Sequence, residues 1–117
     1  MHSSAVVGSD VEMGAGTLIC PNASLTTNLR LGAHCHVNLN ATIGHDTRLG
    51  DFVTINPGAT VSGCVNLADG VTVGTGAAII RGVSVGRFTT IGAGASVVRN
   101  LPNEVTAVGL PAKALNR

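Results

Sequence analysis

Aliphatic residues recur at every sixth position along most of the chain. From Val7 to Val97, sixteen successive positions spaced six apart are all aliphatic. Small or apolar residues stand four positions after many of them, as at Ala23, Cys35 and Ala41. A period of six does not fit the turn of about 3.6 residues in an α-helix, but it suits one short strand and a turn. The pattern therefore predicts a strand-built repeat protein.

Three such repeats make one triangular coil of eighteen residues, and successive coils stack as parallel strands. We therefore predict an all-β chain, a left-handed parallel β-helix of about five coils over residues 1–101. In this register, residues eighteen apart lie one above another. The period fails at Asn103, so residues 102–117 are expected to form a capping tail. This tail is predicted to hold a short strand between Pro102 and Gly109 and a short helix that starts at Pro111.

Composition supports a narrow interior and argues against several classes of protein. Charged residues make up 11% of the chain and aromatic residues 2%, and there are 16 glycines. The net charge is +1 with no basic run, which argues against a nucleic-acid partner. The chain shows neither a membrane span nor a signal peptide, so a cytoplasmic location is expected. Its three cysteines show no CxxC spacing and are interpreted as reduced packing residues.

Several segments resemble the hexapeptide-repeat acyltransferases, most of all the branch of sialic-acid O-acetyltransferases and nucleotide-sugar N-acetyltransferases. The likeness covers nearly the whole chain. It is carried by Thr42–Asp46, Leu49–Phe52, Ile55–Ala59, Gly74–Ala77, Ile91–Ala95 and Val108–Lys113. Typical members carry an N-terminal α/β domain, whereas only six residues precede the first repeat here.

The resemblance implies a homotrimer that binds acetyl-CoA between neighbouring prisms and acetylates a sugar or nucleotide-sugar hydroxyl or amine, with no metal. It identifies His45 with the catalytic base and Asp46 with the acid beside it. Gly63 follows His45 by eighteen residues, so it is expected one coil above, where its N–H would stabilise an oxyanion or its lack of a side chain would only relieve crowding at the corner. The residues expected to bind acetyl-CoA are Thr54, which stands where some relatives have a second histidine, and Gly74, Thr75, Gly76 and Ala93.

The residue types fit this chemistry, provided that the chain turns at His45. A neutral histidine can accept the proton of an attacking hydroxyl or amine near neutral pH. Neighbouring residues on a strand point to opposite faces, so His45 and Asp46 can pair only if the chain turns there. The stacked pairs Gly74/Gly92 and Gly76/Gly94 would leave a bare surface for the pantetheine arm, or serve turn geometry alone. Arg81 and Arg99 could meet CoA phosphates or be solvated.

Two other functions stay open at this stage. One is a non-catalytic β-helix that serves as a scaffold or assembly module. The other is a zinc enzyme of the γ-carbonic-anhydrase type, whose metal is held by three histidines of adjacent subunits. The spacing of His34, His36 and His45 does not match that class, so this alternative is the weaker one.

Overall fold

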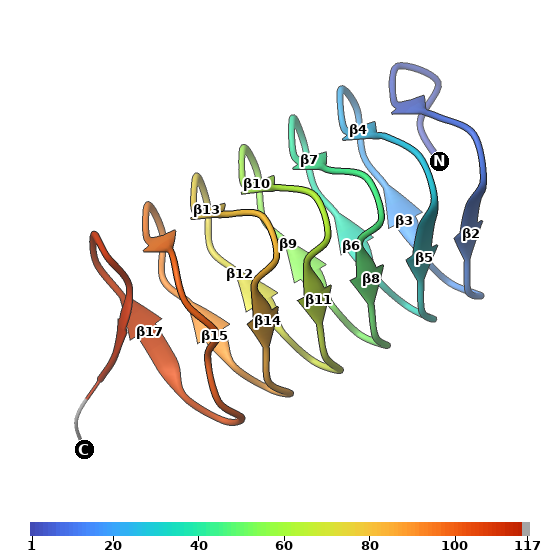
Figure 1. Cartoon of the computed structure of the whole chain (residues 1–117). Coiled ribbons are helices and arrows are strands. Elements are labelled where there is room, and N and C mark those ends of the chain that lie inside the picture. The colour runs from blue at the N-terminus through green and yellow to red at the C-terminus, as the bar shows by residue number, and fades with distance from the viewer. Residues whose placement is uncertain (116–117) are drawn as a thin grey trace.

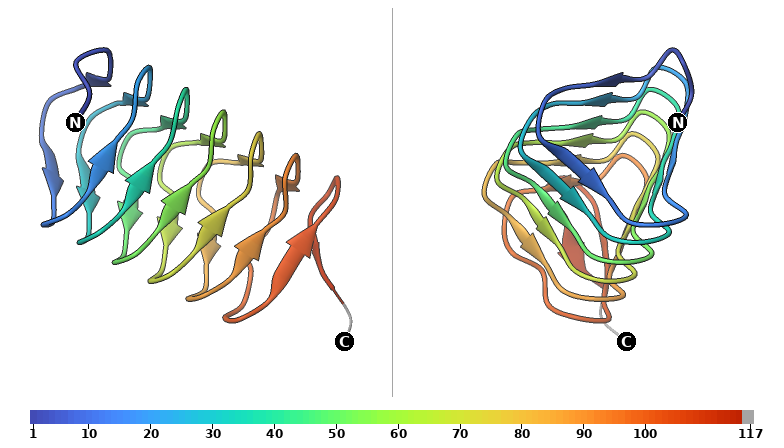
Figure 2. Two further views of the ribbon diagram at one scale, coloured as in Figure 1. Left: turned by 180° about the vertical axis from the view of Figure 1, so that it is seen from behind. Right: turned by 90° about the vertical axis from the view of Figure 1, so that its right-hand side faces the viewer.

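The computed structural model describes residues 1–115, which form a left-handed parallel β-helix (Figure 1). The predicted fold class is confirmed. Strands pair in parallel with those eighteen residues away, so that Thr60 lies between Thr42 and Ala78. The coils stack into a body of 41 × 21 × 20 Å, and Figure 2 shows the N-terminal and C-terminal coils at opposite ends of the stack.

Three sheets, here called A, B and C, form the sides of the prism. Sheet A contains β1 (Val6–Val7), β4 (Ser24–Leu25), β7 (Thr42–Ile43), β10 (Thr60–Val61), β13 (Ala78–Ile79) and β16 (Ser96–Val97). Sheet B contains β2 (Val11–Met13), β5 (Leu29–Leu31), β8 (Arg48–Leu49), β11 (Asn66–Leu67) and β14 (Ser84–Val85). Sheet C contains β3 (Leu18–Ile19), β6 (His36–Val37), β9 (Thr54–Ile55), β12 (Thr72–Val73), β15 (Thr90–Ile91), β17 (Thr106–Val108) and β18 (Lys113–Ala114).

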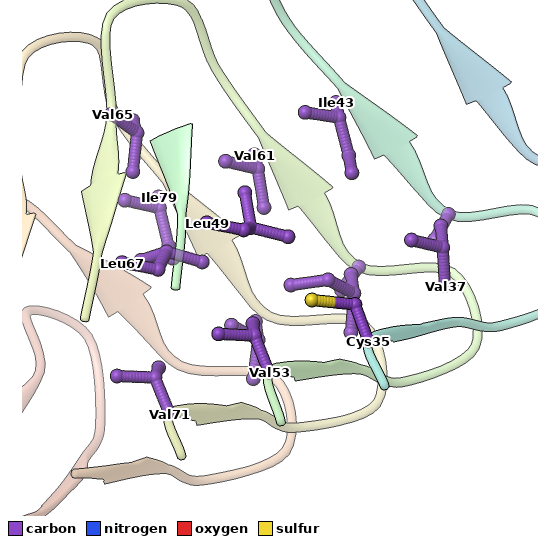
Figure 3. Packing of buried hydrophobic residues seen from close by; sticks show 14 of the residues in the cluster. Cys35, Val37, Ile43, Leu49, Val53, Val61, Val65, Leu67, Val71 and Ile79 are labelled. Carbon is purple, nitrogen blue, oxygen red and sulfur yellow. The ribbon is translucent and has the colours of Figure 1, made fainter. Parts of the chain in front are cut away.

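The aliphatic positions of the sequence pattern fill the interior. All of those from Ile19 to Val97 are buried, while Val7 and Met13, near the N-terminal end, are partly buried against the same core. Figure 3 shows these side chains stacked inside the prism, with Cys35 among them. Burying an aliphatic side chain contributes about 1.5–3 kcal/mol, so the repeat itself supplies most of the hydrophobic stabilisation.

The corners of the prism share one backbone conformation. Every sixth residue from Asp10 to Gly94 has a positive φ, between 55° and 82°. This left-handed region costs a residue with a Cβ about 1–2 kcal/mol, and Gly, Asn and Asp tolerate it best. Eleven of these fifteen corner residues are Gly, Asn or Asp, and the other four are His34, Phe52, Cys64 and Phe88.

The C-terminal end differs in detail from the sequence prediction. Leu101 takes the inward position and bridges Val85, sixteen residues earlier, so the coil is shortened by two residues but continues. β17 then adds a further parallel strand next to β15, and the stack reaches about six coils. Asn103 is therefore a corner residue rather than a break in the core.

A turn, and not the predicted helix, follows β17. The chain reverses, and β18 pairs with β17 in antiparallel fashion, with Ala112 packed against the core. Of the predicted capping tail, residues 116 and 117 lie outside the described residues. No segment of the described chain forms a helix that could cross a membrane.

Candidate active site

His45 and Asp46 lie at a corner between sheets A and B. β7 ends at Ile43 and β8 begins at Arg48, and the chain turns between them, where Asp46 has a left-handed φ of 57°. The turn lets neighbouring side chains meet, since Nδ1 of His45 lies 2.8 Å from Oδ2 of Asp46. Both side chains are about half exposed, at 49% and 47%. The geometric condition set by the sequence is thus met.

The carboxylate of Asp46 is held from two sides. His45 contacts one oxygen, and the amide of Asn28, one coil below, donates to the other. These two hydrogen bonds hold the pKa of Asp46 below its usual value. An ionised carboxylate can only accept, so Nδ1 of His45 carries the ring proton and Nε2 of the neutral ring is left as an acceptor.

Gly63 lies one coil above His45, directly beside the imidazole ring. A Cβ built on Gly63 would lie 2.6 Å from Nε2 of His45, so any other residue would collide with the ring. Gly63 is buried, and its N–H donates no hydrogen bond within the described chain. A free backbone donor therefore lies next to the free ring nitrogen.

The corner between sheets B and C shows why this donor is free. There, the N–H groups of Ala33 and Asp51 each donate to the carboxylate one coil above, on Asp51 and Asp69 respectively, at 2.8 Å. The residue eighteen positions after Gly63 is Arg81, whose side chain has no acceptor. The sequence thus caps the equivalent amides at one corner and leaves the Gly63 amide uncapped.

The residues predicted to bind acetyl-CoA lie elsewhere, around the corner between sheets C and A. Thr54 is half-buried on β9, and Gly74, Thr75 and Gly76 form the turn after β12. Ala93 lies one coil above Thr75. A Cβ added to Gly74 would lie 2.6 Å from the amide nitrogen of Ala93. A Cβ on Gly76 would meet nothing within 4 Å, so the surface there is open.

The structure therefore sorts the predicted residues into two groups. His45, Asp46 and Gly63 come together at one corner, and the four residues from Gly74 to Ala93 come together at another. The strands of sheet A run from the second corner to the first. No pocket is found within residues 1–115 that would join them.

Solved acetyltransferases share this architecture. WeeI from Acinetobacter baumannii AYE and the acetyltransferase domain of PglB from Neisseria gonorrhoeae FA1090 are each 36% identical over 97% of this chain, with TM-scores of 0.94 and 0.96. A histidine mutant of perosamine N-acetyltransferase from Caulobacter crescentus, in complex with CoA and GDP-perosamine, is 34% identical over 100% of the chain, with a TM-score of 0.99.

The chain is similar to the hexapeptide-repeat acetyltransferases. This confirms the resemblance drawn from the sequence, and the chain spans 56% of the length of each of these three proteins. No protein-family profile and no curated protein matches it.

Two residues beside His45 were missed in the sequence. Asn28 and Cys64 stand eighteen residues before and after Asp46, so the register alone could have placed them there. All three cysteines are free, as interpreted from the sequence, and Cys35 is buried in the core. Cys20 and Cys64 are partly exposed, because they lie at corners outside the inward positions of the repeat.

The three histidines of the zinc alternative lie in separate parts of the prism. His34 stacks on Phe52 at the corner between sheets B and C, with ring centroids 5.3 Å apart. His36 lies on β6, where its Nε2 is 3.2 Å from the sulfur of Cys20. Within one chain they do not converge with His45 on a common point.

Proposed function

We propose that this chain transfers an acetyl group from acetyl-CoA to an amine or hydroxyl of a nucleotide-linked sugar. The observation that carries the proposal is the pairing of a free acceptor, Nε2 of His45, with a free donor, the N–H of Gly63. Acyl transfer needs both, because a proton leaves the acceptor while negative charge develops on the thioester oxygen. Similarity over 97–100% of this chain, and 56% of theirs, to acetyltransferases solved with CoA or acetyl-CoA supports the same reaction.

In the proposed reaction, the amine or hydroxyl of the sugar attacks the thioester carbon directly. Nε2 of His45 takes the proton of the attacking group, and the Gly63 N–H binds the oxyanion of the tetrahedral intermediate. The C–S bond then breaks, and the proton passes from His45 to the departing CoA sulfur. Asp46 holds the ring in the required tautomer and stabilises the imidazolium that forms.

A homotrimer would complete the site. Sheet A spans the two groups of site residues. Its outward side chains are all uncharged: Val6, Ser24, Thr42, Thr60, Ala78 and Ser96. Sheet B instead carries Glu12, Arg30 and Arg48. A neighbouring prism packed beside sheet A would turn its surface into a cleft, with Thr54, Gly74, Thr75, Gly76 and Ala93 contacting acetyl-CoA.

Two further observations bear on the class of acceptor and on the compartment. The Caulobacter relative is named an N-acetyltransferase and was solved with GDP-perosamine, which favours a nucleotide-linked amino sugar. The described cysteines are all free, which suits the reducing cytoplasm.

Release of CoA from acetyl-CoA, followed with a thiol reagent, tests the proposal across GDP-, UDP- and dTDP-linked amino sugars and the free sugars. We expect turnover with a nucleotide-linked sugar. His45→Ala should lower kcat about 10²–10⁴-fold, the usual contribution of a general base. His34→Asn serves as the matched control, because it replaces a histidine on another corner by a residue that tolerates the left-handed backbone.

Each outcome of the assay has a clear meaning. Equal losses in the two variants would count against His45 as the base. Failure to bind acetyl-CoA at all would rule out the proposed acetyltransferase activity and favour the non-catalytic scaffold.

A further inference from the structure

We propose that His45, Asp46 and Cys64 form a binding site for a zinc-like divalent cation, and that its occupancy switches off acetyl transfer. The binding part stands on the geometry of the corner alone. The switching part rests on the proposed function, since it requires His45 to be the base.

The β-helix register brings the three side chains together. The N–H of Cys64 donates to the carbonyl of His45 at 2.8 Å, which fixes the spacing of the two coils at this point. Asp46 and Cys64 stand eighteen residues apart and share the left-handed backbone, with φ of 57° and 58°. One ligand atom from each of the three residues lies within 4.8 Å of the others.

The donor set suits zinc better than a harder cation. Thiolate, imidazole and carboxylate all bind Zn²⁺ at about 2.0–2.3 Å, which places tetrahedral donors roughly 3.5 Å apart. Mg²⁺ and Ca²⁺ prefer sites made of oxygen atoms. The donors therefore need to approach each other by a small rotation of side chains, and a water molecule would complete the coordination.

The corner has room for that movement. His45 and Asp46 are about half exposed, and Cys64 is partly exposed. Above Cys64 comes Gly82, where an added Cβ would meet nothing within 4 Å.

Binding would exchange a proton for the ion. The thiol of Cys64 loses its proton as the sulfur–metal bond forms, so one proton leaves to solvent for each ion bound. Asp46 then shares its carboxylate with the ion, and a ring nitrogen of His45 donates its lone pair to it. A histidine held in this way no longer acts as the base for the sugar.

Titration of the purified chain with Co²⁺, a spectroscopic substitute for Zn²⁺, tests binding without any activity assay. We expect one ion per chain and a thiolate-to-cobalt charge-transfer band in the near ultraviolet, both displaced by Zn²⁺. Cys64→Ser should abolish the band and weaken Zn²⁺ binding at least about tenfold. A thermal melt of each variant shows whether it is folded.

Cys20→Ser is the matched control, because Cys20 is also partly exposed and lies beside a histidine. A band that survives in Cys64→Ser and disappears in Cys20→Ser would overturn the proposal and move the site to Cys20 and His36. Absence of any charge-transfer band in the folded native chain would overturn it as well.

The switching part is measured on the enzyme once its acceptor is known. Zn²⁺ should inhibit the native chain and a chelator should restore it. The Zn²⁺ concentration for half inhibition, taken relative to each variant's own uninhibited rate, should rise at least about tenfold in Cys64→Ser. Cobalt binding with no zinc inhibition would refute the switch and keep the site. An active chain without a cobalt band would refute the site and keep the proposed function.

Discussion

At the scale of single residues, the side chain one coil above a corner decides whether the corner amide is hydrogen-bonded. The N–H of Asp51 is capped by Asp69, whereas the N–H of Gly63 finds no acceptor among residues 1–115. Asn103 shows that an amide side chain can also act as a cap, since its Oδ1 accepts from the N–H of Arg87 at 2.9 Å. The residue one coil above a corner therefore decides whether its N–H is available.

Arg81→Asn should place such a cap over Gly63 and occupy the proposed oxyanion donor. We expect kcat to fall, with an upper limit near the 10²–10³-fold lost when an oxyanion donor is removed. Arg81→Ala removes the same charge and offers no acceptor, so it isolates any contribution of Arg81 to acetyl-CoA binding. The measurement is steady-state kcat at saturating acetyl-CoA. Equal kcat values for Arg81→Asn and Arg81→Ala would contradict the role of the Gly63 amide.

The carboxylate of Asp46 gives a prediction in pH. Hydrogen bonds from His45 and Asn28 lower the pKa of Asp46 in the folded state, so this group stabilises the fold above its ordinary pKa of about 3.9. That contribution is lost as the pH falls through the lower, folded value. Carboxyl ¹³C NMR should show a midpoint for Asp46 below 3.9, and His45→Ala should raise it. An unchanged midpoint in His45→Ala would mean that the pair does not form in solution.

At the scale of elements, the sequence predicted the strands well and the end of the stack poorly. The six-residue period determines which side chains point inward, because burial of an aliphatic column depends on spacing alone. The shortening between Val97 and Leu101 changes the spacing where no neighbouring repeat remains to reveal it. The pairing of His45 with Asp46 was conditional in the sequence, since it depends on the left-handed backbone of Asp46.

Gly58→Ala tests the cost of the left-handed corner. A Cβ on Gly58 would meet nothing within 4 Å, so backbone strain at its φ of 71° is the main effect. The free energy of unfolding should fall by about 1–2 kcal/mol in Gly58→Ala and by clearly less in Gly58→Asn, as urea denaturation would measure. Equal losses in the two variants would contradict the role of backbone strain, because Asn tolerates the left-handed conformation better than Ala does.

At the scale of the whole molecule, the prism has unequal sides. On sheet B, Arg30 forms ion pairs with Asp10 and Glu12, at 3.1 and 3.3 Å, so this side is suited to water. The outward residues of sheet A include no Asp, Glu, Lys or Arg, as is also true of sheet C from β3 to β15, but only sheet A lies between the two groups of site residues. An uncharged flat side of this kind is typical of a contact surface between subunits.

Thr60→Arg, on the exposed side of sheet A, should therefore weaken the proposed trimer. Asn66→Arg places the same charge on the exposed side of sheet B and should leave assembly unchanged. Light scattering after gel filtration should give three times the chain mass of 11.7 kDa for the native protein and for Asn66→Arg, and a smaller mass for Thr60→Arg. A native chain that runs at 11.7 kDa would end the trimer proposal.

The eighteen-residue register also restricts how the length of this protein can change. A whole added coil beyond β13 would lengthen the prism by one coil and leave the corner of His45 unchanged. An insertion of six residues between Asp46 and Asn56 would instead rotate every later residue to the next side of the prism. Pro57 would then stand above His45 in place of Gly63, and a proline has no N–H to offer an oxyanion. A change of length between His45 and Gly63 therefore alters the chemistry, whereas the two-residue shortening between Val85 and Leu101 leaves this corner as it is.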